Sequence, residues 1–222
     1  MPIDAANAER IQDRLREHVL LPVERAPLPA IVTGVDISYA IGSDYAVAAA
    51  VTIGTSDLAV REVSLSAGTI TFPYVPGLLA FRELPLLLEA LAGLSAEPAA
   101  LMCDGYGIAH PRRFGLACHL GVLLDLPSFG VAKTDFVSTH GEPGPRRGDW
   151  SPLEAGGELL GRAVRTQDGV KPVYVSAGHR ISLPDASDLT VALSSRYRIP
   201  EPTRQADILS RQALREGLPA RG

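Results

Sequence analysis

The sequence predicts an α/β fold, a mixed sheet of antiparallel and parallel strands flanked by helices. Three apolar runs joined by tight turns come first, which is typical of an antiparallel meander. Shorter apolar runs then alternate with helical segments, the order of parallel β-α-β units. With 222 residues, 46% of them hydrophobic, the chain can bury one substantial core, so we expect a single domain over residues 1–222.

The first part of the chain predicts a helix followed by the meander. Residues 1–20 carry charges at helical spacing, which indicates a helix and argues against a signal sequence. Apolar runs rich in Ala, Val and Ile at 30–39, 45–53 and 58–65 predict three strands, because glycine-containing turns separate them. The segment 72–77 holds two prolines and a glycine and is expected to be a loop.

A helix is expected over Leu78–Leu94, where the apolar spacing is helical. Pro85 has no N–H to donate and would clash with the carbonyl of Phe81, which predicts a helix start or a kink near it. The same stretch contains charges and a proline, which excludes a membrane span. Glu83 therefore falls at an irregular point of a soluble fold.

The second half of the chain predicts the parallel part of the sheet. A buried strand at 99–104 ends on Asp104, a helix at 111–124 follows, and a strand at 128–132 completes a β-α-β unit. Residues 137–157 hold five glycines and three prolines without an apolar period, which predicts a mobile loop.

The remaining elements are a strand at 173–176, a helix at 185–196 and a last helix after Pro200, capped by Thr203 or a neighbour. The complete order of elements fits the ribonuclease-H-like architecture.

The charge and cysteine content restrict the possible partners. The formal net charge of −4 does not attract phosphate backbones, so any nucleic-acid binding has to be local. Arginine pairs occur at 112–113 and 146–147, but such clusters are most often ordinary solvated surface. Cys103 and Cys118 show neither metal-ligand spacing nor a disulfide framework, which favours a reduced, cytoplasmic setting.

Asp36 and Asp104 are the strongest candidates for chemistry. Asp36 interrupts an apolar strand, where an ionised carboxylate needs a partner, and Asp104 closes a second strand at its carboxyl end. If the strands are neighbours, two such charges ~4 Å apart repel by about 4 kcal/mol at an effective dielectric of 20. Oxygen ligands favour Mg²⁺ or Mn²⁺. The alternative for Asp36 alone is a solvent-facing or turn-capping aspartate.

Other residue types give weaker indications. Glu83, taken alone, is more often a surface glutamate. The histidines lack the pairing that zinc requires, and the serines lack the setting of a nucleophile. His110 and Lys133 each follow a strand end by a few residues and could reach the same sheet edge, to contact phosphate or water.

Six separated motifs together carry a resemblance to a known family. They are Gly34-Val35-Asp36, Pro73-Tyr74-Val75-Pro76-Gly77 with Phe81-Arg82-Glu83, Asp104-Gly105-Tyr106-Gly107-Ile108-Ala109-His110-Pro111-Arg112-Arg113, Gly130-Val131-Ala132-Lys133, Gly178-His179-Arg180 and Pro200-Glu201-Pro202-Thr203-Arg204. In this order they resemble endonuclease V, the deoxyinosine nuclease family.

The resemblance implies a ribonuclease-H-like fold and a DNA-repair nuclease dependent on Mg²⁺, for which Mn²⁺ can substitute. The implied cut is at the second phosphodiester on the 3′ side of a deaminated base, leaving 3′-hydroxyl and 5′-phosphate ends. By position, Asp36 and Asp104 are similar to the principal metal ligands of the family. Glu83 matches its third acidic active-site residue, which is also counted as a ligand, and Asp207 falls where the family has Asp or His near the metal.

The resemblance also implies substrate contacts. Tyr74 is similar to the wedge that enters the duplex beside an extruded base, although a packed loop aromatic is the alternative. Lys133 and His110 match positions close to the scissile phosphate, and Lys133 is expected to be catalytic. The remaining expected contacts to the base or to DNA are Pro76, Gly77, Gly105 and Arg112.

Several alternatives stay open. The substrate is expected to be DNA with deaminated bases, but some family members act on inosine in RNA, and no residue decides between them. A protein that binds modified nucleic acid without cutting it is the rival from another class. Tyr106 stands where the family often has His. We expect a monomer without membrane contact, and one or two metal ions.

Overall fold

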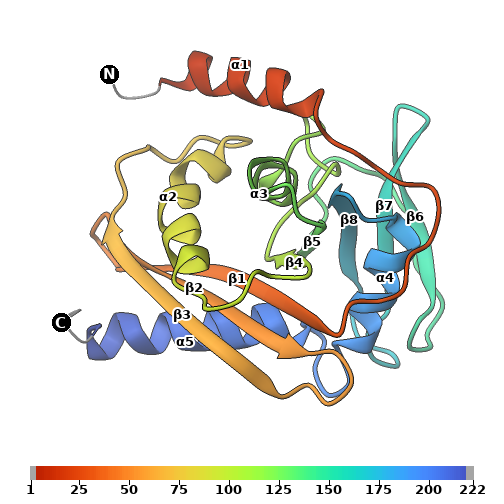
Figure 1. Ribbon diagram of the computed structural model, residues 1–222. Coiled ribbons are helices and arrows are strands. Elements are labelled where there is room, and N and C mark those ends of the chain that lie inside the picture. The colour runs from red at the N-terminus through yellow and green to blue at the C-terminus, as the bar shows by residue number, and fades with distance from the viewer. Residues whose placement is uncertain (1–3, 219–222) are drawn as a thin grey trace.

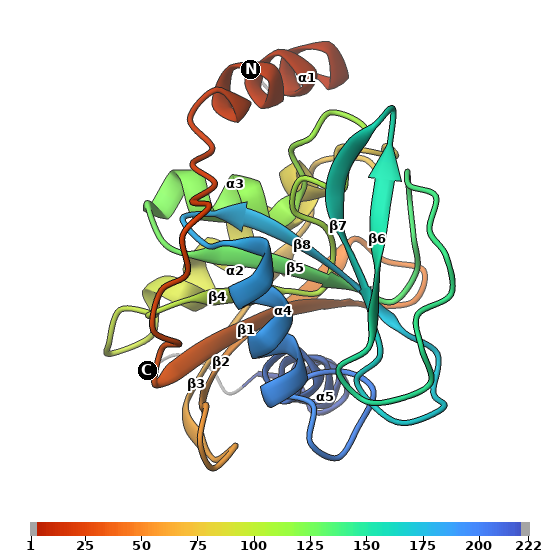
Figure 2. The ribbon, with the colours of Figure 1, turned by 90° about the vertical axis from the view of Figure 1, so that its right-hand side faces the viewer.

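The computed structural model describes residues 4–218, and its eight strands form one mixed sheet in the order β3-β2-β1-β4-β5-β8-β7-β6. Helices α2 (Leu79–Ala92) and α3 (Leu116–Leu124) cover one face. Helices α4 (Leu183–Ala192) and α5 (Glu201–Glu216) cover the other (Figure 1, Figure 2). The predicted ribonuclease-H-like mixed sheet flanked by helices is confirmed. None of the helices in the described range is long and apolar enough to cross a membrane.

The meander consists of β1 (Ile31–Tyr39), β2 (Tyr45–Gly54) and β3 (Val60–Thr69), and each neighbouring pair is antiparallel, as predicted. The third strand begins and ends later than the sequence indicated. Its late start has a local reason, because Leu58 adopts a positive φ of 58° and belongs to the preceding turn. Strand β2 is buried along almost its whole length, since helices pack on both sides of it.

The β-α-β unit is formed by β4 (Leu101–Cys103), α3 and β5 (Ser128–Ala132), with β4 and β5 parallel as predicted. Strand β4 also pairs in parallel with β1, and Val35 is opposite Cys103. The carboxylates of the next residues, Asp36 and Asp104, are therefore brought to adjacent strands. The helix begins only at Leu116, and Pro111 lies in the loop that precedes it.

Helix α2 runs through Pro85, so the expected helix start near this proline is wrong. The helix begins at Leu79, six residues earlier, without a side-chain cap. One side of α2 is buried against the sheet, with Leu84, Leu86 and Leu87 in the core. We infer that this apolar packing compensates for the one helical hydrogen bond that Pro85 cannot donate.

The expected loop over 137–157 is wrong in its second half. Residues Trp150–Ala155 form edge strand β6, which pairs with β7 (Glu158–Val164), a strand the sequence analysis missed. The pair is joined at Gly156-Gly157, both with positive φ, as in tight hairpin turns. Pro152 is tolerated because an edge strand has one side without a partner. Residues 137–149 have little regular structure, although the buried Arg165 donates to the carbonyls of Gly144 and Pro143.

The last elements differ from the predictions only at their ends. Strand β8 (Val173–His179) is longer than expected and lies antiparallel to β5, and α4 ends at Ala192. The expected cap of α5 by Thr203 is wrong. The helix is preceded by Pro200 and has no side-chain cap, and the Thr203 hydroxyl donates to the Pro200 carbonyl from inside the first turn. The expected N-terminal helix is α1 (Ala5–Arg16), and residues 1–3 lie outside the described part.

Candidate active site

Asp36 and Asp104 lie on neighbouring strands, and both line a groove with Asp207 from α5 and Lys133 from the end of β5. We call this the carboxylate groove, and its volume is about 800 Å³. The groove depends on a close approach between β1 and α5. A Cβ on Gly34 would lie 2.1 Å from the carbonyl carbon of Pro202, so only glycine fits there. Gly34 and Asp36 lie on the same face of β1, which turns Asp36 towards α5.

The environment of Asp36 opposes its ionised form. Burial first, and then the charges of Asp104 and Asp207, raise the pKa of Asp36 to about 8. The charge of Lys133 acts in the opposite direction but does not cancel them. The site therefore holds an excess of negative charge that a cation would relieve.

Lys133 supplies the nearest positive charge, since its ammonium group forms an ion pair with the Asp104 carboxylate. Burial lowers the pKa of Lys133, but the hydrogen bond that Lys133 donates to Asp104 and the charges of Asp104, Asp36 and Asp207 outweigh it and raise the pKa overall. Asp207 has its own partner, because Arg211 Nε lies 2.8 Å from Asp207 Oδ1. Lys133 and Asp207 are thus in the groove, as the sequence predicted for both.

Glu83 lies beside the groove and is only 6% exposed. Its Oε1 accepts a hydrogen bond of 2.8 Å from the hydroxyl of Tyr39, which itself lines the groove. Burial, and then the charge of Asp104, raise the pKa of Glu83 to about 7 against the lowering effects of Tyr39 and Arg82. Glu83 is therefore a buried acid in electrostatic contact with Asp104, and the surface-glutamate alternative does not apply.

The carboxylates of the groove offer oxygen atoms, which are the ligands that a divalent ion such as Mg²⁺ prefers. Within residues 4–218, no three acidic, histidine or cysteine side chains are arranged so that they could hold a metal by themselves. Mg²⁺ does not require three, because it is commonly bound by one or two carboxylates together with water and phosphate oxygens. Asp36 and Asp104 fit as that pair of oxygen donors.

A second cavity of about 250 Å³ adjoins the groove, and we call it the loop pocket. Its walls come from helix α1, the turn at Tyr74 with the start of α2, the loop between β4 and α3 with the start of α3, and Phe136 after β5. The lining residues are Gln12, Tyr74, Val75, Pro76, Gly77, Leu79, Ala80, Asp104, Gly105, Tyr106, His110, Gly115, Leu116 and Phe136. Asp104 lines both cavities.

The aromatic residues of the loop pocket differ strongly in exposure. Tyr74 is 71% exposed at the rim, so the alternative of a packed loop aromatic does not hold. Tyr106 stacks on Phe136 with 5.2 Å between ring centroids, and His110 lies 5.9 Å from the same Phe136 ring. Burial lowers the pKa of His110 to about 4, which keeps the imidazole neutral near neutral pH. The pocket wall is thus aromatic and uncharged except at Asp104.

Two predicted site residues, Glu83 and Arg112, line neither cavity. Glu83 is bonded to the groove residue Tyr39, whereas Arg112 is held elsewhere. Its guanidinium lies against α1, 2.5 Å from Asp13 Oδ2 and 3.6 Å from Glu9 Oε2. Arg16 in turn donates to the Arg112 carbonyl over 3.2 Å. The contact of Arg112 with DNA stays a prediction.

The pocket residues that were not among the predicted site residues include Gln12, Tyr106 and Phe136. Phe136 immediately precedes the expected loop, and Gln12 lies on a helix some ninety residues away in sequence from Asp104. No local pattern marks either one. Tyr106 is different, because its place within the Asp104-Gly105-Tyr106 motif could have indicated a role in the pocket.

Comparison with known proteins shows which family this chain resembles. The family model described as endonuclease V matches residues 13–208. The chain belongs to the endonuclease V family. The endonuclease V of Streptomyces coelicolor is 54% identical over 217 residues, which cover 97% of this chain and 93% of that protein. The resemblance inferred from the six motifs is thereby confirmed.

Solved endonuclease V structures share the fold. The crystal structure of endonuclease V from Streptomyces avermitilis is 52% identical with a TM-score of 0.92, covering 97% of this chain and 95% of that one. The endonuclease V of Ciona intestinalis was solved with a 24mer DNA containing an inosine followed by a ribo-adenosine. It is 29% identical with a TM-score of 0.83, covering 95% of this chain and 98% of that one. Endonuclease V enzymes are nucleases that act on DNA.

Proposed function

We propose that this endonuclease V nicks DNA at the second phosphodiester 3′ to deoxyinosine and related deaminated bases, in DNA repair. The reaction is a divalent-metal-dependent hydrolysis with Mg²⁺ as the metal, for which Mn²⁺ can substitute, and it leaves a 3′-hydroxyl and a 5′-phosphate. The substrate is DNA containing deaminated bases, and the enzyme acts as a monomer.

One observation carries the proposal: Asp104 lines the carboxylate groove and the loop pocket at once. A side chain shared by both cavities couples the position of a bound base to the position of the cut. The loop pocket, at about 250 Å³, is smaller than the ~300–1,000 Å³ typical of sites for drug-sized ligands, which suits a single base. Recognition and hydrolysis can therefore act on one strand at neighbouring nucleotides.

In the loop pocket, we assign the extruded base to the space beside Gly77 and Gly105, whose lack of side chains lets backbone approach it closely. Tyr74 at the rim fits the role of the wedge, since an exposed aromatic ring can stack on the bases that remain in the duplex. His110 lines the same pocket as a neutral imidazole, and its Nδ1 accepts from the Arg112 N–H over 3.3 Å, which orients the ring beside the strand next to the base.

In the carboxylate groove, Asp36 and Asp104 would hold the metal, with Glu83 as the third acid and Asp207 beside them. A bound Mg²⁺ would supply water of lowered pKa and would neutralise charge on the phosphate. Lys133 is placed to do part of the same work, because its ammonium group can move from Asp104 to a phosphate oxygen. Because these four acids lie in the groove or beside it, a phosphate bound in the groove would be close to all of them.

The proposal is tested by incubating the purified protein with an end-labelled duplex that contains one deoxyinosine, with Mg²⁺ or with EDTA. We expect a single nick one nucleotide beyond the base, only when Mg²⁺ is present. Cleavage that persists in EDTA would exclude the metal-dependent reaction. Binding of the duplex without any nick would favour the rival protein that binds modified nucleic acid and does not cut it.

The RNA alternative is tested with the same sequence carrying inosine in a ribose strand. Because a 2′-hydroxyl is recognised by local contacts, a matched pair of substrates separates the two activities directly. We expect faster cleavage of the deoxyinosine strand. Faster cleavage of the ribose strand would make the protein an inosine-specific endoribonuclease of the same family.

A further inference from the structure

Helix α1 lies on top of the loop pocket, and one of its side chains reaches into the wall. Gln12 is 1% exposed and lines the pocket. Its Nε2 donates to the carbonyl of Gly77 over 2.9 Å and to the carbonyl of Phe114 over 3.3 Å. Two acceptors on opposite sides fix the orientation of the amide group, since only the nitrogen can donate to both.

The first of these carbonyls belongs to the turn that follows Tyr74. Leu78 N–H donates to the Val75 carbonyl over 2.9 Å, and Pro76 and Gly77 occupy the two central positions. Gly77 has a φ of +81°, the value that a type II turn needs at its second central residue. A hydrogen bond to the Gly77 carbonyl therefore holds the turn that carries Tyr74.

The second carbonyl lies on the opposite loop. Phe114 is fully buried and immediately precedes Gly115, where helix α3 starts. The same loop carries His110, whose ring carbon would be 3.8 Å from a Cβ on Gly77. The single amide of Gln12 thus joins the two loops whose separation sets the width of the pocket.

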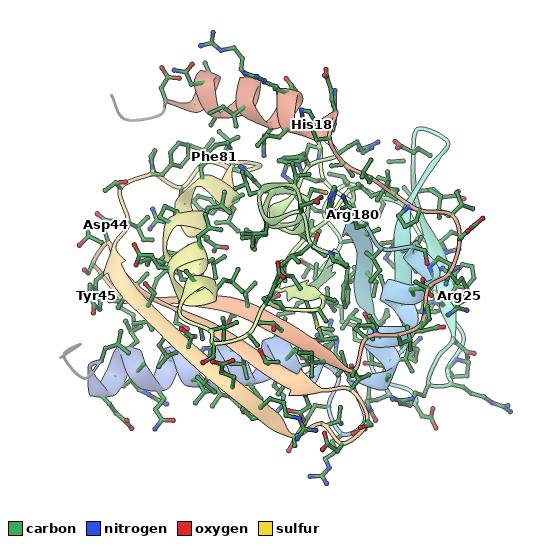
Figure 3. All side chains as sticks on the ribbon, viewed as in Figure 1. His18, Arg25, Asp44, Tyr45, Phe81 and Arg180 are labelled. Carbon is green, nitrogen blue, oxygen red and sulfur yellow. The ribbon has the colours of Figure 1, made fainter. Side chains whose placement is uncertain are left out.

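The amide of Gln12 is not the best group for stability alone, because only its nitrogen is paired. Gln12 Oε1 is buried and has no hydrogen-bond partner, which is unfavourable compared with an apolar side chain of the same length. Helix α1 is already attached by apolar packing of Ala8 against Phe72 and Leu78, in a cluster that includes Phe81 beneath α1 (Figure 3). It is attached as well by the ion pairs of Arg112.

From these contacts we infer that Gln12 is a positioning residue for base recognition: it holds the Gly77 turn and the Phe114 loop at the separation that admits the deaminated base. The inference rests on the proposed function. It assigns to helix α1, which carries none of the catalytic acids, a part in substrate discrimination.

The test compares three variants of the full chain. Gln12→Met keeps the length and removes both donors, and Gln12→Asn keeps the amide but is too short to reach both carbonyls. Arg10→Ala is the control, because Arg10 is exposed on the same helix and bonds only within it. For each we measure cleavage of a deoxyinosine duplex and of the same duplex with deoxyadenosine, as a function of enzyme concentration, together with the melting temperature.

We expect both Gln12 variants to lower the preference for deoxyinosine by about ten-fold, since small displacements of a binding wall have effects of that order. The loss should lie in the half-saturating concentration, with the rate at saturation retained. Gln12→Met removes two hydrogen bonds but also the unpartnered Oε1, so its melting temperature should change by no more than about 4 °C. Arg10→Ala should change none of these values.

Unchanged preference in folded Gln12→Met and Gln12→Asn would overturn the inference. So would unfolding of both under conditions where Arg10→Ala is folded, because Gln12 would then serve the fold and not the pocket. If the unmodified protein does not cut the deoxyinosine duplex, the proposed function fails, and the preference is then measured as the ratio of affinities for the two duplexes.

Discussion

The carboxylate groove and the loop pocket share Asp104 but are built from different kinds of structure. The groove takes its charged side chains from strands β1 and β4, the end of β5 and helix α5. The pocket takes most of its wall from two loops that are held together by a side chain of α1. In the proposed function, regular elements fix the groups that act on the phosphate, and loops shape the part that selects the base.

The two regions also differ in electrostatics. The groove concentrates carboxylates whose mutual repulsion and burial raise the pKa of Asp36. In the pocket, the buried His110 is kept neutral, and the main contacts are aromatic rings and backbone carbonyls. Substitutions in the groove should therefore affect the rate of hydrolysis, and substitutions in the pocket should affect the choice of base.

Asp104→Asn should have the largest effect, because it removes the one charged group that both regions use. We expect cleavage of a deoxyinosine duplex to fall by at least about a thousand-fold, since the loss of preorganised charge at a reacting centre costs on the order of 10²–10³ and a proposed metal ligand is lost as well. Affinity for the duplex should be retained. The measurement is single-turnover cleavage together with a binding assay in Ca²⁺. Cleavage within ten-fold of the unmodified protein would contradict the metal-site proposal.

The groove should make the metal-free protein less stable as the pH rises. The folded-state pKa of Asp36 is about 8, against about 3.9 in an unfolded chain. Between these values the folded state keeps a proton that the unfolded state has released, so stability is highest at low pH within this window and is lost towards pH 8. From pH 6 to pH 8 the free energy of unfolding should fall by up to about 2 kcal/mol.

Chemical denaturation in EDTA at a series of pH values measures this loss, and Asp36→Asn is the matched variant. It should remove most of the slope, leaving the smaller contribution of Glu83, whose raised pKa acts with the same sign.

The pocket should respond to pH in the opposite direction. The lowered pKa of His110 means that its contribution to stability is lost as the pH falls from about 6.5 towards 4. If the free energy of unfolding depended on pH with the same slope in Asp36→Asn and in the unmodified protein, the proposed electrostatic difference between the groove and the pocket would be wrong.

Tyr74→Ala should affect the pocket without affecting the groove. Stacking of a base on an aromatic ring is worth about 1–3 kcal/mol, so discrimination between deoxyinosine and deoxyadenosine should fall by roughly ten-fold or more. Tyr74→Phe keeps the ring and is the control. Because Tyr74 is 71% exposed, neither change should alter the melting temperature. An equal loss on duplexes with and without inosine would argue against a wedge.

The central acids of the groove were predictable from the residues alone, whereas Tyr74, Pro76, Gly77 and Gly105 of the pocket were predicted only through the family resemblance. Asp36 and Asp104 stand out because a carboxylate within or after an apolar strand has a cost of burial that only a partner offsets. Asp207 and Glu83 required the family resemblance, since both lie on helices whose docking no local pattern reveals. Gln12 and Phe136 reach the pocket through tertiary contacts alone. Their positions follow from packing between distant segments and could not be predicted from periodicity.

The errors in the fold have a similar origin. The hairpin of β6 and β7 was missed because the glycines and prolines of 137–157 were interpreted together as a loop. The pair Gly156-Gly157 is in fact a hairpin signal between two alternating strands. Helix α2 continues through Pro85 because burial of its apolar face outweighs one missing hydrogen bond. In both cases tertiary packing decides an outcome that local propensity leaves open.

Arg112→Ala should have the smallest effect, and it tests whether the boundary of the pocket includes this residue. The guanidinium is paired with Asp13 and Glu9 at the surface, and such pairs contribute at most about 1 kcal/mol. We therefore expect Arg112→Ala to lose little stability. Asp13→Asn is the matched control, because it removes the charge of one partner of Arg112 and should lose about the same amount. The decisive measurement is the salt dependence of DNA affinity. A slope reduced by about one in Arg112→Ala, and unchanged in Asp13→Asn, would show that Arg112 contacts a phosphate. An unchanged slope in both variants would show that Arg112 serves only to attach helix α1 to the pocket wall.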